Sequence, residues 1–448
     1  MRGGVFGGER YCVVGLGRNG LPVAHALDAM GAQVEVWDDR DDARAAAPFP
    51  LRDPEAGLRG FTALVLSPGI PHRFPAPHPA ATAAIEAGIP IFSDAELLYQ
   101  ATRRRGSKAR FAGVTGTNGK STTTALLHHM FVSAGWESAA GGNLGTPALA
   151  LAELGDEGVY VLEMSSYMLE RLATLRFDAG ALLNLSPDHL DRHGDMAGYV
   201  AAKLHIFDRQ ADGDTAVIGI DDAESASIAA GMTRRVTVSG LNPADFWCDR
   251  GILRDPRGPL FDMAEAPALP GPHNAQNAAG AAALATSLGL GREAIATGLR
   301  SFPGLPHRQQ RVAVIDGVAW VNDSKATNAD ATARALACYD RVVWIAGGQA
   351  KAGGIETLRP LFARVAHVLL IGRDAPILAA TLEKQGVPYS MPGTLEAAVP
   401  QARTLAAVLG ADTVLLSPAC ASFDQFSGFE ARGARFAELA VATVREPV

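Results

Sequence analysis

The sequence is poor in several features that mark specialised classes of protein. Its 448 residues include four cysteines, far apart and without a Cys-x-x-Cys pair, which argues against a disulfide scaffold or a zinc ribbon and favours reduced thiols. Charged residues make up 19% of the chain and aromatic residues 6%. Lys and Arg number 40 against 47 Asp and Glu, so no basic excess points to nucleic acid as a partner.

Long hydrophobic runs are also lacking. The longest apolar stretch, Ala278 to Leu290, contains Gly and hydroxyl residues and is shorter than the ~20 residues of a membrane-spanning helix. No apolar segment typical of a secretory signal precedes the first expected strand, so we expect a cytoplasmic protein. Hydrophobic residues still reach 48%, and the length predicts about three domains at roughly 150 residues each.

Short apolar runs alternate with helix-length amphipathic runs, and this alternation of expected strands and helices predicts α/β domains with parallel sheets. We expect domain ranges of 1–107, 108–304 and 305–448, the first and third Rossmann-like and the central one built like a phosphate-loop ATPase. The polar stretch Arg103–Lys108 and the Pro- and Gly-containing Ser301–Arg308 are the expected junctions. The expected strands are Tyr11–Val14, Val34–Trp37, Ala63–Leu66, Ile89–Phe92, Phe111–Val114, Val159–Glu163, Ala181–Leu185, Val318–Asn322, Val342–Ala346, Val368–Ile371 and Thr413–Ser417.

Helices are expected at Pro22–Met30, Ser121–Ala134 and Asn274–Leu288. The segment from Arg235 to Leu269 is rich in Pro, Gly and alternating residues, which favours β-hairpins over helix.

The strongest local signal is GVTGTNGKSTTT, Gly113 to Thr124, which follows an expected strand and opens an expected helix. Glycines let successive backbone N–H groups converge on phosphate oxygens, and the helix N-terminus adds partial positive charge. Lys120 would reach the β- and γ-phosphates and Ser121 would bind Mg²⁺. The usual motif has a glycine where this chain has Val114, so the loop is a variant. It predicts binding of a nucleoside triphosphate.

Three further segments hold candidate site residues. Glu163 ends a strand expected beside the phosphate loop, where a carboxylate can hold Mg²⁺, although an acidic residue in a turn is often only a helix cap. Asp188 and His189 follow another strand and could serve a second metal ion or a substrate phosphate, or be structural. Lys203 lies on a helix that would return to the same place, although a helical lysine is ordinarily a solvated surface residue.

A second glycine motif, Gly15-x-Gly-x-x-Gly20, follows the first strand, with Asp38 and Asp39 some twenty residues on. Alone it suggests NAD and a dehydrogenase. A dinucleotide fold needs two βαβαβ halves, however, and only about 90 residues separate Gly15 from the phosphate loop. No hydride-transfer residues are identifiable, so a dehydrogenase remains only a remote alternative.

Nine motifs together resemble one family. GVTGTNGKST, GGNLGTP, YVLEMSS, NLSPDHLDRH, AAKLHIF, GPHNAQN, GLPHR, NDSKATN and LLSPACASFDQF occur in the order found in the Mur ligases of peptidoglycan precursor synthesis. The Val321–Asn328 segment and the closing Leu416–Gly433 segment are most similar to the members that add D-glutamate to UDP-N-acetylmuramoyl-L-alanine. The resemblance implies an ATP-dependent, amide-forming ligase that works through an acyl phosphate and a tetrahedral intermediate.

The resemblance also implies roles for individual residues. Lys120, His189 and Lys203 would be catalytic. Ser121 and Glu163 would hold a first Mg²⁺ and His189 a second, and Lys203 would react with CO₂ to give a metal-binding carbamate. ATP contacts would come from Gly116, Thr117, Asn118, Gly119, Lys120, Ser121, Thr122, Asn277, Arg308, Asp323 and Lys325. UDP-muramoyl-alanine contacts would come from Arg18, Asn19, Asp39, Arg40, Gly69, Asn143 and His189, and glutamate contacts from Thr327, Lys351, Ser422 and Phe429.

One departure from the family pattern bears on the amino acid. The segment Gly347–Lys351 continues Ala-Gly-Gly-Ile, without the acidic and aromatic pair expected there. A relative that adds L-glutamate to the same UDP precursor therefore stays open, as does a catalytically silent binding protein. We expect a monomer whose third domain swings about the Ser301–Arg308 linker.

Overall fold

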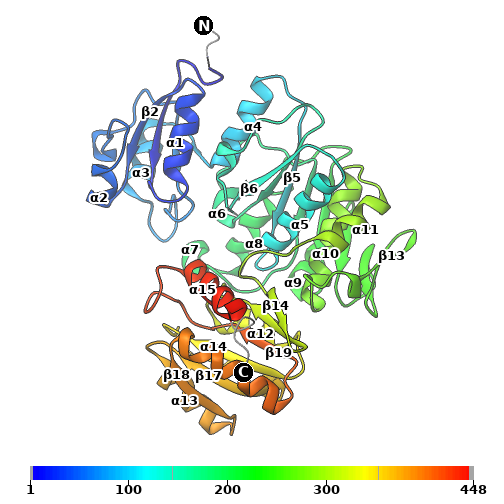
Figure 1. The fold of residues 1–448 in the computed structure, drawn as a ribbon. Coiled ribbons are helices and arrows are strands. Elements are labelled where there is room, and N and C mark those ends of the chain that lie inside the picture. The colour runs from blue at the N-terminus through cyan, green and yellow to red at the C-terminus, as the bar shows by residue number, and fades with distance from the viewer. Residues whose placement is uncertain (1–3, 144, 352, 443–448) are drawn as a thin grey trace. The chain divides into compact units, whose positions relative to one another are not determined.

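The computed structural model describes residues 4–143, 145–351 and 353–442 (Figure 1). The chain divides into two compact units. Residues 1–266 and 272–302 form the first, and residues 267–271 and 303–448 form the second. The break at residue 302 falls inside the expected linker Ser301–Arg308, while the three-domain ranges stay a prediction.

The first unit begins with a small parallel sheet. Its strands are β1 (Arg10–Val14), β2 (Gln33–Trp37), β3 (Ala63–Leu66) and β4 (Ile91–Phe92), in the order β2-β1-β3-β4. The central strands β1 and β3 are short apolar runs buried along nearly their whole length, as expected for parallel strands covered on both faces. The accompanying helices are α1 (Gly20–Ala29), α2 (Asp41–Ala45), the 3₁₀ turn η1 (Pro54–Ala56), α3 (Pro79–Ala87) and α4 (Asp94–Arg104).

The same unit contains a larger sheet, which has nine strands in the described part of the chain. The strands are β5 (Arg110–Thr115), β6 (Ser138–Gly142), β7 (Val159–Glu163), β8 (Ala179–Leu182), β9 (Thr215–Gly219), β10 (Val236–Ser239), β11 (Phe246–Asp249), β12 (Ile252–Asp255) and β13 (Gly258–Asp262). Their order is β13-β12-β11-β10-β9-β8-β5-β7-β6, so β5 lies between β7 and β8.

Helices α5 (Lys120–Ser133), α10 (Pro272–Ser287) and α11 (Arg292–Ser301) pack side by side against this sheet (Figure 1). The other helical segments of this part are η2 (Ala148–Ala150), α6 (Ser166–Leu169), α7 (Leu190–His193), α8 (Met196–Leu204), α9 (Ala223–Gly231) and η3 (Met263–Glu265). The apolar stretch near Ala278 is thus a buried core helix. Within the described residues no helix is long and apolar enough to cross a membrane.

Buried acidic side chains of α4 tie the small sheet's part of the unit to the large sheet. Asp94 accepts a hydrogen bond from the backbone N–H of Ala148 at 2.5 Å. Glu96 is fully buried and accepts backbone N–H groups from residues 173–175 at 2.9–3.0 Å. Since a buried carboxylate is costly unless it is hydrogen-bonded, these bonds hold the two parts together.

The second unit is built on a six-stranded sheet, counted over the described residues, in the order β14-β15-β19-β16-β17-β18. Its elements are β14 (Gln310–Ile315), β15 (Val318–Asn322), α12 (Ala329–Leu336), β16 (Val342–Gly347), η4 (Glu356–Arg364), β17 (Val365–Ile371), α13 (Ala375–Lys384), β18 (Tyr389–Gly393), α14 (Leu395–Leu409), β19 (Thr413–Leu416) and α15 (Phe429–Ala442). Among the described strands of this six-stranded sheet only the β14–β15 pair is antiparallel, and apolar clusters fill both faces.

The α/β class and most of the expected strands are confirmed. One strand is displaced: β8 ends at Leu182 rather than running from 181 to 185, because residues 183–185 turn toward the phosphate loop. The expected hairpins of Arg235–Leu269 are only partly correct. Strands β11, β12 and β13 form antiparallel hairpins, but β10 pairs in parallel with both β9 and β11.

Candidate active site

The phosphate-loop segment Gly116–Gly119 joins the buried strand β5 to the helix α5, as predicted. Lys120 folds back over it, and its Nζ donates to the carbonyl oxygens of Gly116 at 2.8 Å and Thr117 at 2.7 Å. Gly119 has φ +84°, and a Cβ there would meet the Oδ1 of Asn277 at 2.1 Å. Glycine is therefore required at 119, and Asn277 on α10 lies against the loop where a nucleotide contact was predicted.

Asn184 forms hydrogen bonds with this loop, and no role was predicted for it from the sequence. Its Oδ1 accepts the N–H of Asn118 at 2.9 Å, and its Nδ2 donates to the carbonyl of Asn118 at 3.1 Å. Its backbone carbonyl accepts the N–H of Thr117 at 2.9 Å. The sequence signal available for this role was the position of the asparagine, two residues after the end of β8, the strand beside β5.

Lys203 is brought to the same loop by α8, as predicted. The side chain is 2% exposed, and its Nζ donates to the carbonyl of Gly116 at 2.8 Å and lies 4.6 Å from the centre of the Tyr199 ring. Burial, reinforced by the nearby Lys120 ammonium, lowers the pKa of Lys203 well below its usual range. This lysine is therefore a buried residue and not a solvated surface one.

Glu163 closes strand β7, whose register sets it beside Val114 at the end of β5. It is 2% exposed, and Asn143 donates from Nδ2 to its Oε1 at 2.7 Å. Its Oε2 is buried and has no hydrogen-bond partner among the described residues. A buried carboxylate oxygen left without a donor is suited to a cation.

The residues around Glu163 offer a magnesium ion only a few protein ligands. The described residues contain no group of three or more His, Cys, Asp or Glu side chains able to hold a metal. Mg²⁺ commonly takes one or two protein oxygens and completes its shell with phosphate and water. Glu163 and the Ser121 hydroxyl at the start of α5 match that pattern, whereas a second ion at His189 stays a prediction.

His189 lies where α7 begins, in a left-handed backbone conformation with φ 53°. Its Nε2 is 3.5 Å from a carboxylate oxygen of Asp188, and its ring lies against Tyr167 with ring centres 5.2 Å apart. Burial lowers the pKa of His189, and the charges of Lys120 and Lys203 act in the same direction. The carboxylate of Asp188 acts in the opposite direction, and the net lowering of the pKa, set by burial, favours the neutral imidazole that a metal ion binds.

A cavity of about 390 Å³ opens over the second glycine motif, Gly15 to Gly20, and we call it the N-terminal cavity. Four of the predicted UDP-substrate residues line it, namely Arg18, Asn19, Asp39 and Arg40. Gly69 lies between two further lining residues, Pro68 and Ile70. Asn143 is not at this cavity but at Glu163.

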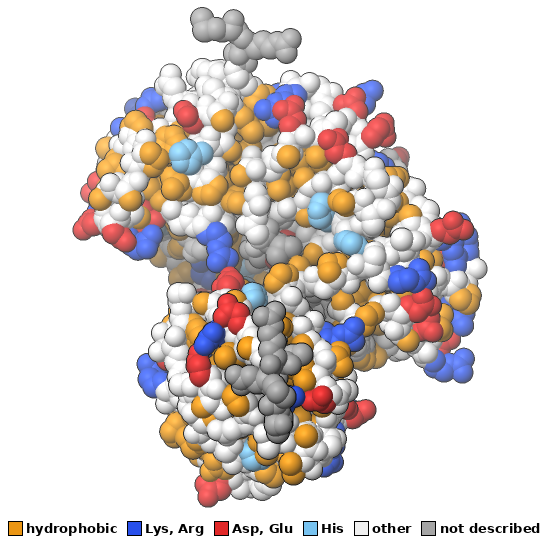
Figure 2. All heavy atoms as spheres, viewed as in Figure 1, with side chains coloured by type: hydrophobic (Ala, Val, Ile, Leu, Met, Phe, Trp, Pro, Cys, Tyr) orange, Lys and Arg blue, Asp and Glu red, His pale blue; other side chains and the backbone are white. Residues whose placement is uncertain are grey.

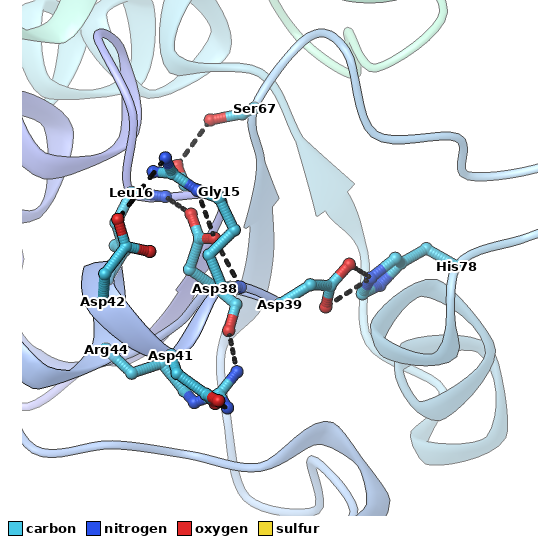
Figure 3. Close-up of polar contacts among 10 residues, drawn as sticks. Gly15, Leu16, Asp38, Asp39, Asp41, Asp42, Arg44, Ser67 and His78 are labelled. Carbon is cyan, nitrogen blue, oxygen red and sulfur yellow. Dashed lines mark hydrogen bonds and ion pairs between the residues drawn. The ribbon is translucent and has the colours of Figure 1, made fainter.

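The two neighbouring aspartates at this cavity have different partners, as Figure 3 shows. Asp38 is buried and accepts the backbone N–H of Leu16 at 2.7 Å and that of Arg40 at 3.0 Å, so it supports the glycine turn. Asp39 faces the other way, toward Nε2 of His78 at 3.1 Å. Both aspartates line the cavity, and the role of Asp39 toward a substrate stays a prediction.

In the second unit the predicted residues gather round the end of the six-stranded sheet. Burial raises the pKa of Asp323 to about 7, and Ser417 donates to this carboxyl group at 2.8 Å. The Nζ of Lys325 lies 3.9 Å from the centre of the Phe429 ring. A backbone bridge between Gln349 and Ala421 brings the Lys351 segment beside Ser422. Contacts of Arg308, Thr327, Lys351, Ser422 and Phe429 with ligands stay predictions.

Arg432 organises this region and was missed by the sequence analysis. It is 1% exposed, and its guanidinium donates to the Ser324 hydroxyl at 2.9 Å and to the carbonyls of Ser324 at 2.9 Å and Cys420 at 3.1 Å. Ser324 in turn donates to the carbonyl of Phe429 at 2.9 Å.

The charged side chains of the surface are mixed in sign. On the face seen in Figure 2, Lys, Arg, Asp and Glu side chains lie interspersed.

Comparison with known proteins agrees with this arrangement. Models of the Mur ligase middle domain and of the Mur ligase glutamate ligase domain match residues 114–285 and 307–420. Relatives named UDP-N-acetylmuramoylalanine–D-glutamate ligase are 49% identical in Paramagnetospirillum magneticum, over 97% of both chains, and 47% identical in Rhodospirillum rubrum, over 97% of this chain and 94% of that protein.

Solved structures share the fold. UDP-N-acetylmuramate-alanine ligase MurC from Thermotoga maritima has a TM-score of 0.61 at 16% identity, covering 97% of this chain and 99% of that one. MurF from Acinetobacter baumannii has a TM-score of 0.56 at 18% identity, covering 87% of this chain and 93% of that one. With the phosphate loop, Lys203 and Glu163 brought together in the first unit, the chain belongs to the Mur ligase family.

Proposed function

We propose that this protein is an ATP-dependent ligase that adds D-glutamate to UDP-N-acetylmuramoyl-L-alanine during peptidoglycan precursor synthesis in the cytoplasm. The observation that carries the proposal is 46–49% identity over 96–97% of the chain to relatives named for this reaction. The clustering of Lys120, Glu163 and Lys203 at the phosphate loop supports it, since this is the charge pattern that the reaction needs.

The reaction first joins two anions. The substrate carboxylate attacks the γ-phosphorus of ATP, and ADP leaves as the acyl phosphate forms. Two unit charges 4 Å apart repel by ~4 kcal/mol at an effective dielectric of 20, so the site must supply positive charge. Lys120 stands at the start of α5, where its ammonium can leave the loop carbonyls for the phosphates.

The amine of glutamate then attacks the acyl carbon, and phosphate leaves from the resulting tetrahedral intermediate. Thr327, Lys351, Ser422 and Phe429 on the second unit are proposed to bring the amino acid, and Asn277, Arg308, Asp323 and Lys325 to contact ATP. Lysine can pair with a glutamate carboxylate as a point charge. Their arrangement around a bound ligand is part of the proposal.

Magnesium is proposed at Ser121 and Glu163, with a second ion at His189, and when bound it neutralises charge on the phosphates. The lowered pKa of Lys203 supports a further step. Its neutral Nζ would attack CO₂, a new N–C bond would form as a C=O π bond opens, and the released proton would pass to solvent. The product carbamate carries oxygen ligands where an ammonium would repel a cation.

The test offers UDP-N-acetylmuramoyl-L-alanine, Mg-ATP and a panel of D- and L-amino acids to the purified protein, and measures phosphate release and product mass. We expect consumption of D-glutamate alone, with one phosphate released per product. Consumption of L-glutamate would favour the L-glutamate-adding alternative, and no phosphate release with any amino acid would overturn the proposal. Sedimentation of the same sample tests the expected monomer.

A further inference from the structure

Two segments of the second unit that are proposed to hold the amino acid meet through their backbones. We call residues 348–351 the Lys351 segment and residues 421–424 the Ser422 segment. The backbone N–H of Gln349 donates to the carbonyl of Ala421 at 2.8 Å, and the N–H of Ala421 donates back at 2.9 Å. This bridge ends two residues before Lys351, so it does not by itself fix the lysine.

The immediate neighbours of Lys351 offer no polar side chain that could fix it. Ala350 precedes it, and the sequence Ala-Gly-Gly follows. Gly353 and Gly354 have φ of 86° and 53°, a region that glycine enters freely and that adds conformational freedom to the chain. A side chain that holds this stretch therefore comes from another part of the chain.

Asp374 supplies this contact from the turn between β17 and α13. Its Oδ2 accepts the backbone N–H of Ala350 at 2.9 Å, although the two residues are 24 positions apart in the chain. Its own N–H donates to the carbonyl of Gly348 at 3.1 Å. Asp374 thus binds the Lys351 segment on both sides of Gln349, and the second of these places is directly before Lys351.

The contact replaces the ordinary use of an aspartate at this position. Asp374 is the N-cap residue of α13, where a carboxylate usually accepts an N–H from the first turn of its own helix. Its side chain makes no such bond and binds Ala350 instead. Arg373 donates from Nε to Oδ1 at 3.1 Å, and together with the Ala350 N–H it lowers the pKa of Asp374. The carboxylate is therefore ionised at neutral pH and serves a contact between distant segments.

The same turn is also held against the Ser422 segment. The Oδ2 of Asp424 accepts the backbone N–H of Arg373 at 2.8 Å. Gly372 has φ +80°, and a Cβ there would lie 2.5 Å from the Oδ2 of Asp424 and 2.6 Å from the Cα of Gly348. Only glycine fits at this point, and the turn at residues 372–374 contacts both segments at once.

We propose that Asp374 is a positioning residue for the amino-acid substrate. Its carboxylate joins the Lys351 segment to the turn that also contacts Asp424, and it thereby sets where Lys351 stands relative to Ser422. The affinity for glutamate then depends on Asp374, while the contacts to the ligand come from the two segments. This inference rests on the proposed function, which assigns the amino acid to them.

The test compares two substitutions that both leave a good N-cap residue on α13. In Asp374→Asn the amide oxygen can still accept the N–H of Ala350. In Asp374→Ser the hydroxyl can cap the helix, but the side chain is one bond shorter and the contact with Ala350 is lost. Glu383→Ala, at an exposed residue of the same helix, is the control. Steady-state kinetics is measured with glutamate, ATP and the UDP substrate varied in turn.

We expect Asp374→Ser to raise the KM for D-glutamate by about 10-fold and to leave kcat and the KM values for ATP and the UDP substrate unchanged. Asp374→Asn and the control should stay close to wild type. An unchanged KM for D-glutamate in Asp374→Ser would overturn the proposal. Equal changes in the serine and asparagine variants would also overturn it, as would a rise in all three KM values, which would show a general structural role.

Hydrogen exchange separates this inference from the proposed function. Peptides that contain residues 349–351 should exchange faster in Asp374→Ser than in Asp374→Asn, because the Ala350 N–H loses its acceptor. Equal exchange would overturn the role of the contact. A wild-type protein that releases no phosphate with D-glutamate would count against the proposed function instead, and the exchange rates would still decide whether Asp374 fixes the Lys351 segment.

Discussion

The Nζ of Lys203 donates to the carbonyl oxygen of Gly116, the first residue of the phosphate-loop segment, at 2.8 Å. A lysine on α8 thus contacts a loop residue that precedes it by 87 positions in the chain. The contact helps to explain how this lysine side chain is only 2% exposed, since the carbonyl replaces water as its hydrogen-bond partner. Four predictions follow from this site and its counterpart in the second unit.

Lys203→Ala is expected to abolish ligase turnover, and Lys203→Arg to do the same, because a guanidinium keeps the charge but does not form the proposed carbamate. Wild-type activity should fall in CO₂-depleted buffer and return with bicarbonate. Phosphate release assays measure both effects. Lys384→Ala, an exposed lysine of α13, is the matched control. Full activity in Lys203→Arg would refute the carbamate.

Glu163→Gln is expected to lower turnover by roughly 100-fold, because it removes the negative charge from the buried oxygen proposed to bind magnesium. A Mg²⁺ titration of activity should shift to higher concentration. The melting temperature should not fall, since the substitution removes a buried charge and leaves the acceptor for Asn143. The exposed Glu157→Gln serves for comparison. An unshifted titration would contradict the assignment.

Asn184→Ala is expected to raise the KM for ATP by about 10-fold, because two hydrogen bonds that fix Asn118 are lost. Asn184→Asp keeps the acceptor for the Asn118 N–H but loses the donor, so it should lie between alanine and wild type. Steady-state kinetics with varied ATP measures the series. The same KM in all three proteins would mean that the loop does not need this clamp.

The raised pKa of Asp323 predicts a pH dependence of stability. A carboxyl group whose folded pKa is about 7, above its unfolded value, contributes stability at low pH that is lost as the pH rises to and through 7. Asp323→Asn, which cannot ionise, should therefore gain in melting temperature relative to wild type between pH 5 and pH 8. Calorimetric scans at several pH values measure the difference, and a pH-independent difference would argue against it.

The sequence predicted the elements whose pattern is local. The strand before Gly116 and the helix after Gly119 follow from an apolar run, a glycine-rich turn and a helix-forming segment. Glu163 and Lys203 were candidates from their places after a strand and on a helix, and their specific roles came from the family resemblance, because neither residue type is informative alone. Asp39 was predicted as a contact of the UDP substrate on the same resemblance.

What the sequence did not predict depends on packing between distant segments. Asn184 acts through the backbone of Asn118, 66 positions away, and Arg432 through that of Ser324, 108 positions away, and no periodicity reports such pairs. The parallel pairing of β10 with β11 was missed because a Pro- and Gly-rich connection of this kind usually indicates a hairpin. The end of β8 was misplaced for a related reason, since Leu183 and Leu185 are apolar but lie beyond the end of the strand.

The hydrogen bonds from Lys120 to Gly116 and Thr117 have a consequence for nucleotide selection. An incoming nucleotide must exchange these two carbonyl partners for its own phosphate oxygens before the ammonium is released. A triphosphate offers more negative oxygens for that exchange than a diphosphate does, so we expect the two carbonyl contacts of Lys120 to favour ATP over ADP.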